Sequence, residues 1–274
     1  MKNVNPSISV IVSTYNSEEW LEKVLWGFHF QSFKNFEVVI ADDGSGPKTK
    51  ELLRVMEDAV SFQIVHVWQK DEGFQKSKIL NKALKACSAE YIIMTDGDCI
   101  PRNDFVEVHL HNCAPGYFLS GGYYMLPMHI STLIGKEDIE RQNCFNIHWL
   151  TSNGIPKKFK NSKLMVRGYV SKVLNSLTPT NASWNGHNSS GWKRDILKVN
   201  GFDERMQYGG QDRELGERLR NSGIKAKQLR YTAVCVHLDH KRGYKTSESI
   251  TKNKAIRKEV RISRCSWTHY GIAR

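Results

Sequence analysis

Blocks of apolar residues separated by polar ones run along the first hundred positions and predict alternating strands and helices. The segments "ISVIVSTYN", "FEVVIADDGS", "FQIVHVWQ" and "EYIIMTDGD" are rich in β-branched, aromatic and other apolar residues, which favours strands. In residues 17–29 the apolar positions repeat at helical spacing, and helices are also predicted near residues 49–58 and 75–86. Strand and helix therefore alternate from residue 8 to residue 98.

The predicted strands are apolar along most of their length instead of at every second position. A strand of this kind is buried on both faces, as in a mainly parallel sheet with helices on both sides. We therefore predict an α/β protein with a Rossmann-like, mainly parallel sheet. Ligands of such sheets bind beyond the carboxyl ends of the strands.

Polar residues gather at the ends of three of these strands. Residues 13–16 end the first strand, residues 42–45 the second and residues 96–98 the fourth. Each group alone is also explained by a helix cap or a turn. All three are expected at one edge of a parallel sheet, so together they predict a ligand site there.

Two acids of the fourth group, Asp96 and Asp98, indicate what that ligand contains. Carboxylates this close together stay ionised only near a cation, and oxygen ligands suit Mg²⁺ or Mn²⁺. Gly97 between them leaves the turn free to direct one carboxylate to a metal and the other to a sugar hydroxyl. A diphosphate usually accompanies such a metal, and Lys76 and Lys78 are candidates to hold it. The sequence contains neither a P-loop nor a dinucleotide-binding fingerprint.

At this point the order of the motifs resembles a known family. "ISVIVSTYNSEEWL", "FEVVIADDGS" and "DGD" are similar to the motifs of family 2 glycosyltransferases with the GT-A fold. The segments "GFQKSKILNKAL" and "GWKRDILKVNGFDERMQYGGQDRELGERL" are similar to the donor and catalytic regions of the beta-1,4-galactosyltransferase-like branch and its bacterial relatives. The resemblance covers roughly residues 7 to 240. It implies inverting, metal-dependent sugar transfer from a UDP-hexose or UDP-N-acetylhexosamine.

The resemblance also implies a role for individual residues. It assigns the donor nucleotide to Thr14, Tyr15, Asn16, Glu18, Asp42, Asp43, Phe74, Lys76, Lys78, Asp96 and Gly97. It assigns the donor sugar or the acceptor to Trp192, Tyr208, Gly209, Gly210 and Gln211. It implies that Asp98 and His237 bind the metal, with His240 as the fallback. Gln211 stands where the family usually has Glu and Tyr208 where it has Trp, so the sugar could differ although the reaction is kept.

The base is the residue whose chemistry can be argued independently. An acceptor hydroxyl is a poor nucleophile until a carboxylate takes its proton, and inversion requires one carboxylate opposite the leaving group. Asp212 in "YGGQDRE" is the candidate, with Glu214 next in line. The alternative is that Asp212 only caps the following helix. For His237 the alternative is a buried histidine without a metal.

The domain division expected from these motifs has three parts. Residues 1–244 are predicted to form one GT-A domain, with a nucleotide-binding half at about 1–112 and an acceptor and catalytic half at about 113–244. Residues 245–274 form a basic tail that is predicted to be helical. In such a helix Ile256, Val260 and Trp267 would lie roughly along one side, either on an anionic bilayer or against the catalytic domain.

Composition and charge restrict the partners. The chain has 274 residues and a net charge of +12, and much of the excess lies in residues 155–172 and 245–264. Its six cysteines include no C-x-x-C pair, and no window has eighteen consecutive apolar residues. We therefore expect a cytoplasmic protein with peripheral contact to the anionic inner face of the membrane. There it would meet its acceptor, a glycan or lipid-linked glycan of bacterial surface polysaccharide or lipopolysaccharide synthesis. A sugar nucleotidyltransferase is the alternative enzyme; a nucleic-acid-binding protein is disfavoured, because no nucleic-acid motif occurs.

Overall fold

The computed structural model describes residues 5–241 and 246–273. The first part of the chain contains β1 (Ile8–Thr14), α1 (Glu18–His29), β2 (Phe36–Asp42), α2 (Pro47–Ala59), β3 (Gln63–Trp68), α3 (Lys76–Ala86), β4 (Tyr91–Asp96), β5 (Cys99–Pro101) and α4 (Phe105–Asn112). The remainder contains β6 (Tyr117–Met125), α5 (Met128–Leu133), α6 (Lys136–Glu140), α7 (Ile147–Ser152), α8 (Ser162–Met165), α9 (Gly168–Leu177), β7 (Ser189–Trp192), α10 (Lys193–Lys198), α11 (Gln211–Asn221), β8 (Lys225–His237) and α12 (Ser247–Ser263). Short 3₁₀ helices lie at Asn143–Phe145 and Phe159–Asn161.

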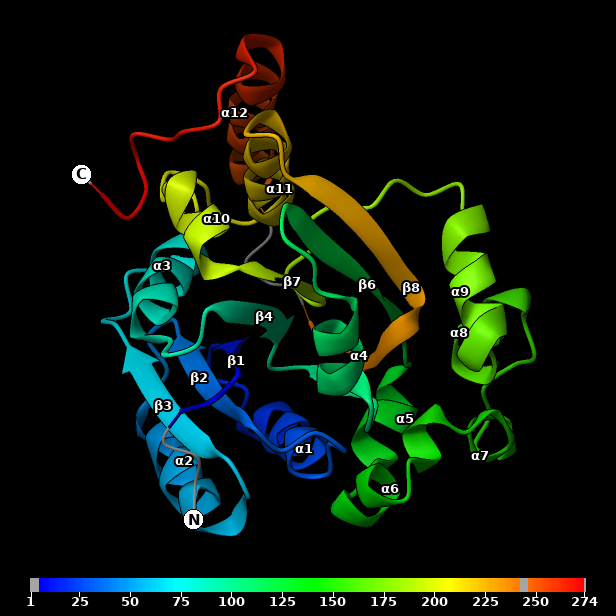
Figure 1. The fold of residues 1–274 in the computed structure, drawn as a ribbon. Coiled ribbons are helices and arrows are strands. Elements are labelled where there is room, and N and C mark those ends of the chain that lie inside the picture. The colour runs from blue at the N-terminus through cyan, green and yellow to red at the C-terminus, as the bar shows by residue number, and fades with distance from the viewer. Residues whose placement is uncertain (1–4, 242–245, 274) are drawn as a thin grey trace.

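One sheet runs through the molecule, with helices packed around it (Figure 1). Its eight described strands have the order β3-β2-β1-β4-β7-β6-β8-β5. The strands β1 to β4 are parallel to one another, as the alternation of strands and helices predicts. In the second half β7 runs antiparallel to both β4 and β6, so the sheet as a whole is mixed. The predicted α/β fold is confirmed, and the parallel part of the sheet is the part that carries the motifs.

Both faces of the sheet are buried, which explains why the inner strands lack alternation. Along β1, the side chains of Val10 and Val12 pack into one hydrophobic core with α1, whereas Ile11 packs into a second core with α3, α10 and α11. All three are fully buried. The strand β3 differs because it lies at the sheet edge, and several of its residues are exposed.

The C-terminal helix α12 packs against α11, side by side with it in Figure 1. Ile256 and Val260 are buried, and Arg257 forms an ion pair with Glu217 of α11 at 2.6 Å. The apolar side of α12 is therefore used within the chain. Of the two predicted arrangements for the tail, the structure shows packing on the catalytic domain, so Ile256 and Val260 are not available to a bilayer. Lys245, where the predicted tail begins, lies outside the described residues.

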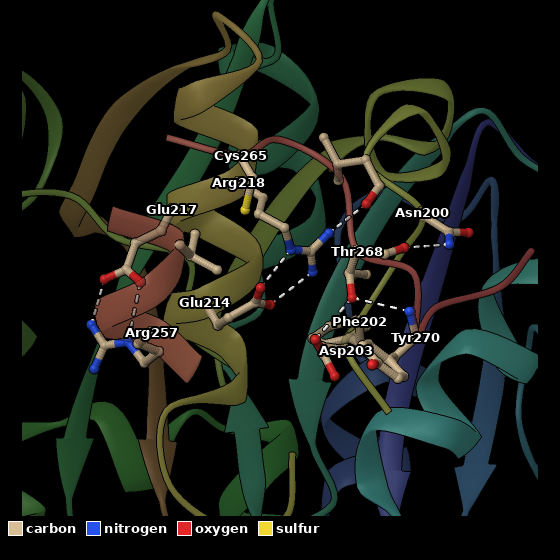
Figure 2. A network of polar contacts seen from close by, with 12 residues as sticks. Asn200, Phe202, Asp203, Glu214, Glu217, Arg218, Arg257, Cys265, Thr268 and Tyr270 are labelled. Carbon is tan, nitrogen blue, oxygen red and sulfur yellow. Dashed lines mark hydrogen bonds and ion pairs between the residues drawn. The ribbon is translucent and has the colours of Figure 1, made fainter. Parts of the chain in front are cut away.

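A buried ion pair fixes α11, the helix whose first turn contains the predicted base, Asp212. Glu214 and Arg218 lie one turn apart with fully buried side chains, and the Arg218 Nε–Glu214 Oε1 distance is 2.5 Å. The Arg218 guanidinium also donates to the carbonyls of Val199 and Gly201, which follow α10 (Figure 2). Removing one partner of a buried ion pair destabilises a protein by several kcal/mol. These contacts therefore hold α11 in a fixed position against the sheet.

Candidate active site

The register of the parallel strands brings the three groups of polar strand-end residues together. Ser13 pairs with Asp96 on β4, and Thr14 pairs with Asp42 on β2. The Gly97 amide donates to the Ser13 carbonyl at 2.8 Å, and a Cβ on Gly97 would lie 3.0 Å from that oxygen. A glycine therefore lets the loop after β4 fold back over β1.

A cavity of about 730 Å³ opens at this edge. It is lined by Ser13, Thr14, Tyr15, Asn16, Ser17, Ala41, Asp43, Gly73, Phe74, Lys76, Ile79, Asp96, Gly97, Asp98, Tyr123, Met125, His187, Tyr208, Gln211, Asp212, His237, His240 and Lys241. Its volume lies in the range of pockets that bury a drug-sized ligand. Both halves of the chain contribute to it.

At the centre of the cavity a lysine meets two carboxylates. Lys76 Nζ, from the first turn of α3, lies 2.6 Å from Asp96 Oδ1, which also accepts a hydrogen bond from the Ser13 hydroxyl. Burial opposes the charge on each partner. The ion pair outweighs it, so that the pKa of Asp96 lies far below its usual value and the pKa of Lys76 well above. The negative charge of Asp212 also raises the pKa of Lys76. Lys76 is therefore a permanent positive charge at a point where phosphate oxygens could bind.

Asp98 lies between two histidines from the end of β8. Its Oδ2 is 3.0 Å from His240 Nε2, and its Oδ1 is 3.6 Å from His237 Nε2. The backbone fixes this arrangement, because the Leu238 amide donates to the Asp98 carbonyl and β5 pairs with β8. His237 and His240 use Nδ1 toward the Leu238 and Lys241 carbonyls respectively, which leaves both Nε2 atoms directed at Asp98.

This donor set fits a divalent cation. Carboxylate oxygens suit Mn²⁺, histidine is a common metal ligand, and the remaining positions would be open to phosphate oxygens. Cys99 Sγ, His237 and Asp98 also bring ligand atoms within 4.8 Å of one another. The Cys99 thiol is fully buried and does not line the cavity, and burial raises its pKa well above the usual value. Cys99 is therefore a poor ligand here, and both histidines remain candidates.

Asp212 lies in the first turn of α11 and faces the cavity. Its Oδ1 is buried and has no hydrogen-bond partner among the described residues. The helix cap is Gly210, so Asp212 is not the N-cap, and the alternative interpretation of this residue as a cap is wrong. A Cβ on Gly186 would lie 2.9 Å from both carboxylate oxygens, so a glycine in the loop before β7 makes the space that Asp212 occupies.

Burial raises the pKa of Asp212 to about 6, with the Lys76 charge opposing the rise and Asp96 adding to it. Glu214, the second candidate base, does not line the cavity, and both of its carboxylate oxygens accept from Arg218. Glu214 is therefore a structural residue in this fold. Of the two carboxylates, Asp212 is the one that lines the cavity and has an oxygen, Oδ1, without a hydrogen-bond partner in the described part of the chain.

The loop before Asp212 is held by α12. Asn253, whose side chain is fully buried, donates to the carbonyls of Gln207 and Gly209 at 2.9 and 3.1 Å. Gly209 and Gly210 both have positive φ, and a Cβ on Gly210 would lie 3.1 Å from Arg257. Residues 265–273 continue from α12 to Asn200 and Asp203, where Thr268 donates to the Asp203 carboxylate (Figure 2). The segment beyond residue 245 thus supports the loop that carries Tyr208 and leads into Gln211 and Asp212 of α11.

The remaining donor-site residues form one side of the cavity. Asp43 accepts from the Gln69 side chain and the Gln75 amide, and burial raises its pKa. The Thr14 hydroxyl is buried and has no hydrogen-bond partner within the described ranges. The rings of Phe74 and Tyr208 meet edge to face at 5.8 Å and connect this side to the Asp212 loop.

Several residues implicated by the resemblance do not line the cavity. Asp42 accepts from Ser45 and His66 and shapes the loop after β2, and Glu18 accepts from the Thr49 hydroxyl. Lys78 pairs with Glu72 at 3.4 Å on the surface. Gly209 and Gly210 shape the loop without lining the cavity.

Trp192 lies at the opposite edge of the sheet. It pairs with Tyr91, at the amino end of β4, and its indole donates to the Ala114 carbonyl. The structure therefore does not bring Trp192 to the sugar-binding region. Helical or strand spacing cannot reveal this, because the direction of β7 is set only by its pairing with β4.

The cavity residues missed by the sequence reasoning include Tyr123, Met125 and His187. His187 stacks edge to face on Tyr123, and burial lowers its pKa to about 4, so its imidazole is neutral at pH 7. The histidine in "NGHNSSG" was the only available signal for it. Tyr123 and Met125 carry no local signal, because they belong to an ordinary strand, β6.

The raised pKa of Asp212 predicts the pH dependence of turnover. A base must be deprotonated to accept a proton, so kcat/KM should fall about tenfold per pH unit below pH 6 and reach a plateau above it. An ordinary aspartate would keep the plateau down to about pH 4. The measurement is donor turnover between pH 4.5 and 8.5, with circular dichroism as a check on folding. A plateau that persists to pH 4.5 would contradict the assignment.

Comparisons with known proteins agree with the geometry. Residues 9–114 match the family described as "Glycosyl transferase family 2", and residues 178–241 match the "N-terminal domain of galactosyltransferase". A validoxylamine A glucosyltransferase from Streptomyces hygroscopicus subsp. limoneus is 26% identical over 238 residues, which cover 80% of this chain and 49% of that protein. A chondroitin synthase from Escherichia coli is 26% identical over 226 residues, covering 79% and 32%. The chain thus spans about half the length, or less, of these relatives.

Solved structures show the same fold. A mannosyltransferase from Pyrobaculum calidifontis in complex with GDP-Man and Mn²⁺ has a TM-score of 0.60 at 19% identity, over 88% of this chain and 59% of that one. The S. aureus protein TarS (residues 1–349) in complex with UDP-GlcNAc has a TM-score of 0.58 at 17% identity, over 89% and 60%. The fold of the chain is therefore the GT-A fold. Over residues 9–114 the chain is similar to the family 2 glycosyltransferases, as the motifs predict.

Proposed function

We propose that the chain transfers a hexose or N-acetylhexosamine from a UDP-sugar to a hydroxyl of a glycan acceptor, with inversion and with Mn²⁺ or Mg²⁺. The observation that carries this proposal is the meeting of three groups in one cavity. The cavity is lined by a permanent cation, Lys76, by a carboxylate flanked by two histidines, Asp98, and by Asp212, a carboxylate whose Oδ1 has no hydrogen-bond partner among the described residues.

Each group has a separate task in this reaction. Lys76 balances the negative charge of a diphosphate, while Asp96 is held by Ser13 and Lys76 in a position to accept from a ribose hydroxyl. Asp98 with His237 or His240 would hold the metal, which supplies a Lewis acid for the leaving diphosphate when bound. The uracil and ribose would contact Thr14, Tyr15 and Asp43, which line the same end of the cavity.

Asp212 acts as the base in this proposal. As the acceptor oxygen bonds to the anomeric carbon, its proton passes to the Asp212 carboxylate. Because the pKa of this group is about 6, the proton leaves to solvent again at neutral pH, and the base is ready for the next turnover. Inversion follows when one carboxylate activates the acceptor on the face opposite the leaving group.

The relatives support this class of donor and acceptor. TarS is solved with UDP-GlcNAc, and chondroitin synthase is named for a glycan product. We infer a glycan or lipid-linked glycan acceptor in bacterial surface polysaccharide or lipopolysaccharide synthesis. Across residues 5–241 and 246–273, no helix has the length and apolar character needed to cross a membrane. We infer a place in the cytoplasm, with peripheral contact to the inner leaflet.

A panel of nucleotide sugars tests the proposal. The full chain is incubated with each UDP- and GDP-sugar, with and without Mn²⁺, and release of nucleoside diphosphate is measured. At least one UDP-sugar should release UDP in a Mn²⁺-dependent way. Formation of a nucleotide sugar from a nucleoside triphosphate and a sugar phosphate, with release of pyrophosphate, would instead indicate a nucleotidyltransferase.

A further inference from the structure

The helix α9 presents its apolar side outward. Its inner side is small and polar: Ser171 is buried, and Asn175 exchanges hydrogen bonds with Thr232 and the Tyr231 amide of β8. At about 100° of rotation per residue, Tyr169, Val173 and Leu177 lie on the opposite side of the helix from Ser171 and Asn175. A surface helix normally buries its apolar side, so α9 is reversed.

The exposed apolar side chains continue into the segment before α9. They are Phe159, Met165, Tyr169, Val170, Val173 and Leu177, and we call them the apolar patch. Phe159 is 90% exposed, Tyr169 80% and Leu177 71%, values that leave nearly the whole side chain in water. Large exposed apolar patches on soluble domains usually mark a contact with a partner or a membrane.

Exposed lysines alternate along the chain with the residues of the apolar patch. Lys157, Lys158, Lys160 and Lys172 are exposed, and no Asp or Glu occurs in the sequence between Glu140 and Asp195. A run of this length without an acid is unusual in a chain that has 28 acidic residues. The surface around α9 therefore complements a negatively charged partner that also has an apolar interior.

The segment that carries the apolar patch contacts one residue of the cavity. The helices α8 and α9 lie beside β8 (Figure 1), and Lys163 of α8 donates to the carbonyl of Tyr123 at 3.2 Å. Tyr123 lines the cavity opposite the donor-site residues of β1. A partner bound at α9 would thus lie near the half of the site that remains for the acceptor.

We propose that residues 157–177 are the membrane-docking surface of this enzyme and that their partner is an anionic lipid bilayer. The aliphatic side chains of α9 would enter the level of the headgroups, and the exposed lysines would contact lipid phosphates. Valine, leucine and methionine gain from lipid contact but offer little to a soluble polyanion, which favours a bilayer over a nucleic acid or an acidic glycan. The inference deepens the proposed peripheral contact by locating it on α9 instead of the C-terminal tail.

Vesicle sedimentation of the full chain tests this docking surface. The chain should bind vesicles of equal parts phosphatidylglycerol and phosphatidylcholine at about 50 mM NaCl, and should bind pure phosphatidylcholine at least about tenfold more weakly. The apolar variant Phe159→Ser/Tyr169→Ser/Leu177→Ser should lose at least about tenfold in affinity for the anionic vesicles, since it removes inserted side chains but no charge. The charge variant Lys157→Gln/Lys158→Gln/Lys160→Gln should lose a similar factor.

The matched control removes the same charge from the tail. Lys252→Gln/Lys254→Gln/Lys258→Gln changes three exposed lysines of α12 and should bind vesicles within about threefold of the unaltered chain. Equal losses in the tail and α9 charge variants would overturn the proposal in favour of net charge alone. Unchanged binding of the apolar variant, or no binding by the unaltered chain, would also overturn it.

The failure of this inference is separable from a failure of the proposed function. All of the substituted side chains are exposed, so each variant should keep its circular dichroism spectrum and its UDP release with a soluble acceptor. Vesicle binding without any sugar transfer would leave the docking surface intact and contradict the enzyme assignment. Sugar transfer without vesicle binding would leave the enzyme assignment intact and contradict the docking surface.

Discussion

Asp212→Asn should lower turnover by roughly 10²–10⁴-fold while donor affinity hardly changes. The substitution keeps the size and most of the hydrogen-bonding capacity of the side chain but removes its ability to accept a proton. The space made by Gly186 accommodates either side chain, so the loss should be in catalysis and not in folding. Turnover is measured by UDP release, and donor affinity by calorimetry with UDP and Mn²⁺.

A second readout separates this loss from misfolding. The pKa of Asp212 is raised in the folded chain, so stability from this group is fully present below its unfolded pKa of about 3.9 and is lost as pH rises through about 6. At pH 7.5 the buried charge therefore destabilises the fold, and Asp212→Asn should raise the free energy of unfolding by on the order of 2 kcal/mol. At pH 4 the gain should largely disappear.

Glu217→Gln is the matched control for the catalytic loss. Glu217 lies on the same helix, pairs with Arg257 and does not line the cavity, so its amide variant should keep turnover within about threefold. If Asp212→Asn retained near-normal turnover, the base would have to be another carboxylate of the cavity. Glu214 could not take the role, because Arg218 occupies both of its oxygens.

Asp98→Ala should abolish metal-dependent donor binding. Asp98 is the carboxylate toward which both histidines direct Nε2, so its removal leaves imidazoles alone to hold a divalent cation. We expect the affinity for UDP in the presence of Mn²⁺ to fall by at least about 100-fold, and UDP affinity without metal to stay within about threefold. Calorimetry with and without Mn²⁺ measures both.

Two further variants complete this test. Asp239→Asn removes a neighbouring carboxylate that does not line the cavity, and it should leave UDP and Mn²⁺ binding nearly unchanged. His237→Ala and His240→Ala, compared side by side, identify the ligand by the larger loss. Equal affinity for UDP plus Mn²⁺ in Asp98→Ala and the unaltered chain would refute a metal site at Asp98.

The local sequence was enough for the first half of the fold. The predicted helices and strands of residues 8–96 agree with the structure within a few residues, because their periodicity and composition act over short distances. The strand ends could also be assigned to one edge, since parallel strands joined by helices must all finish on the same side. The placement of Thr14, Asp43, Asp96 and Asp98 at the cavity follows from these two rules.

The second half of the site depended on pairings between distant segments. Trp192 lies far from the cavity because β7 runs antiparallel to β4, and Tyr123 and His187 reach the cavity only through β6 and the loop before β7. The periodicity of apolar residues does not reveal the direction or the order of strands in a sheet. Residues in such strands could be assigned only by resemblance, and the tryptophan assigned in this way does not line the cavity.

The sequence alone determined the fold class, the edge of the sheet where the cavity lies and the residue types gathered there, because the hydrophobic period is a local property and parallel strands joined by helices all end on the same side. Tertiary structure decided the rest. It placed Asp98 between His237 and His240, which are about 140 positions away in the chain. It also packed the Asp212 carboxylate against Gly186. It buried Ile256 and Val260 against α11 and left the apolar side of α9 in water. Burial and long-range contact arise from packing the whole chain, so an amphipathic segment alone cannot show which of its sides the protein will cover.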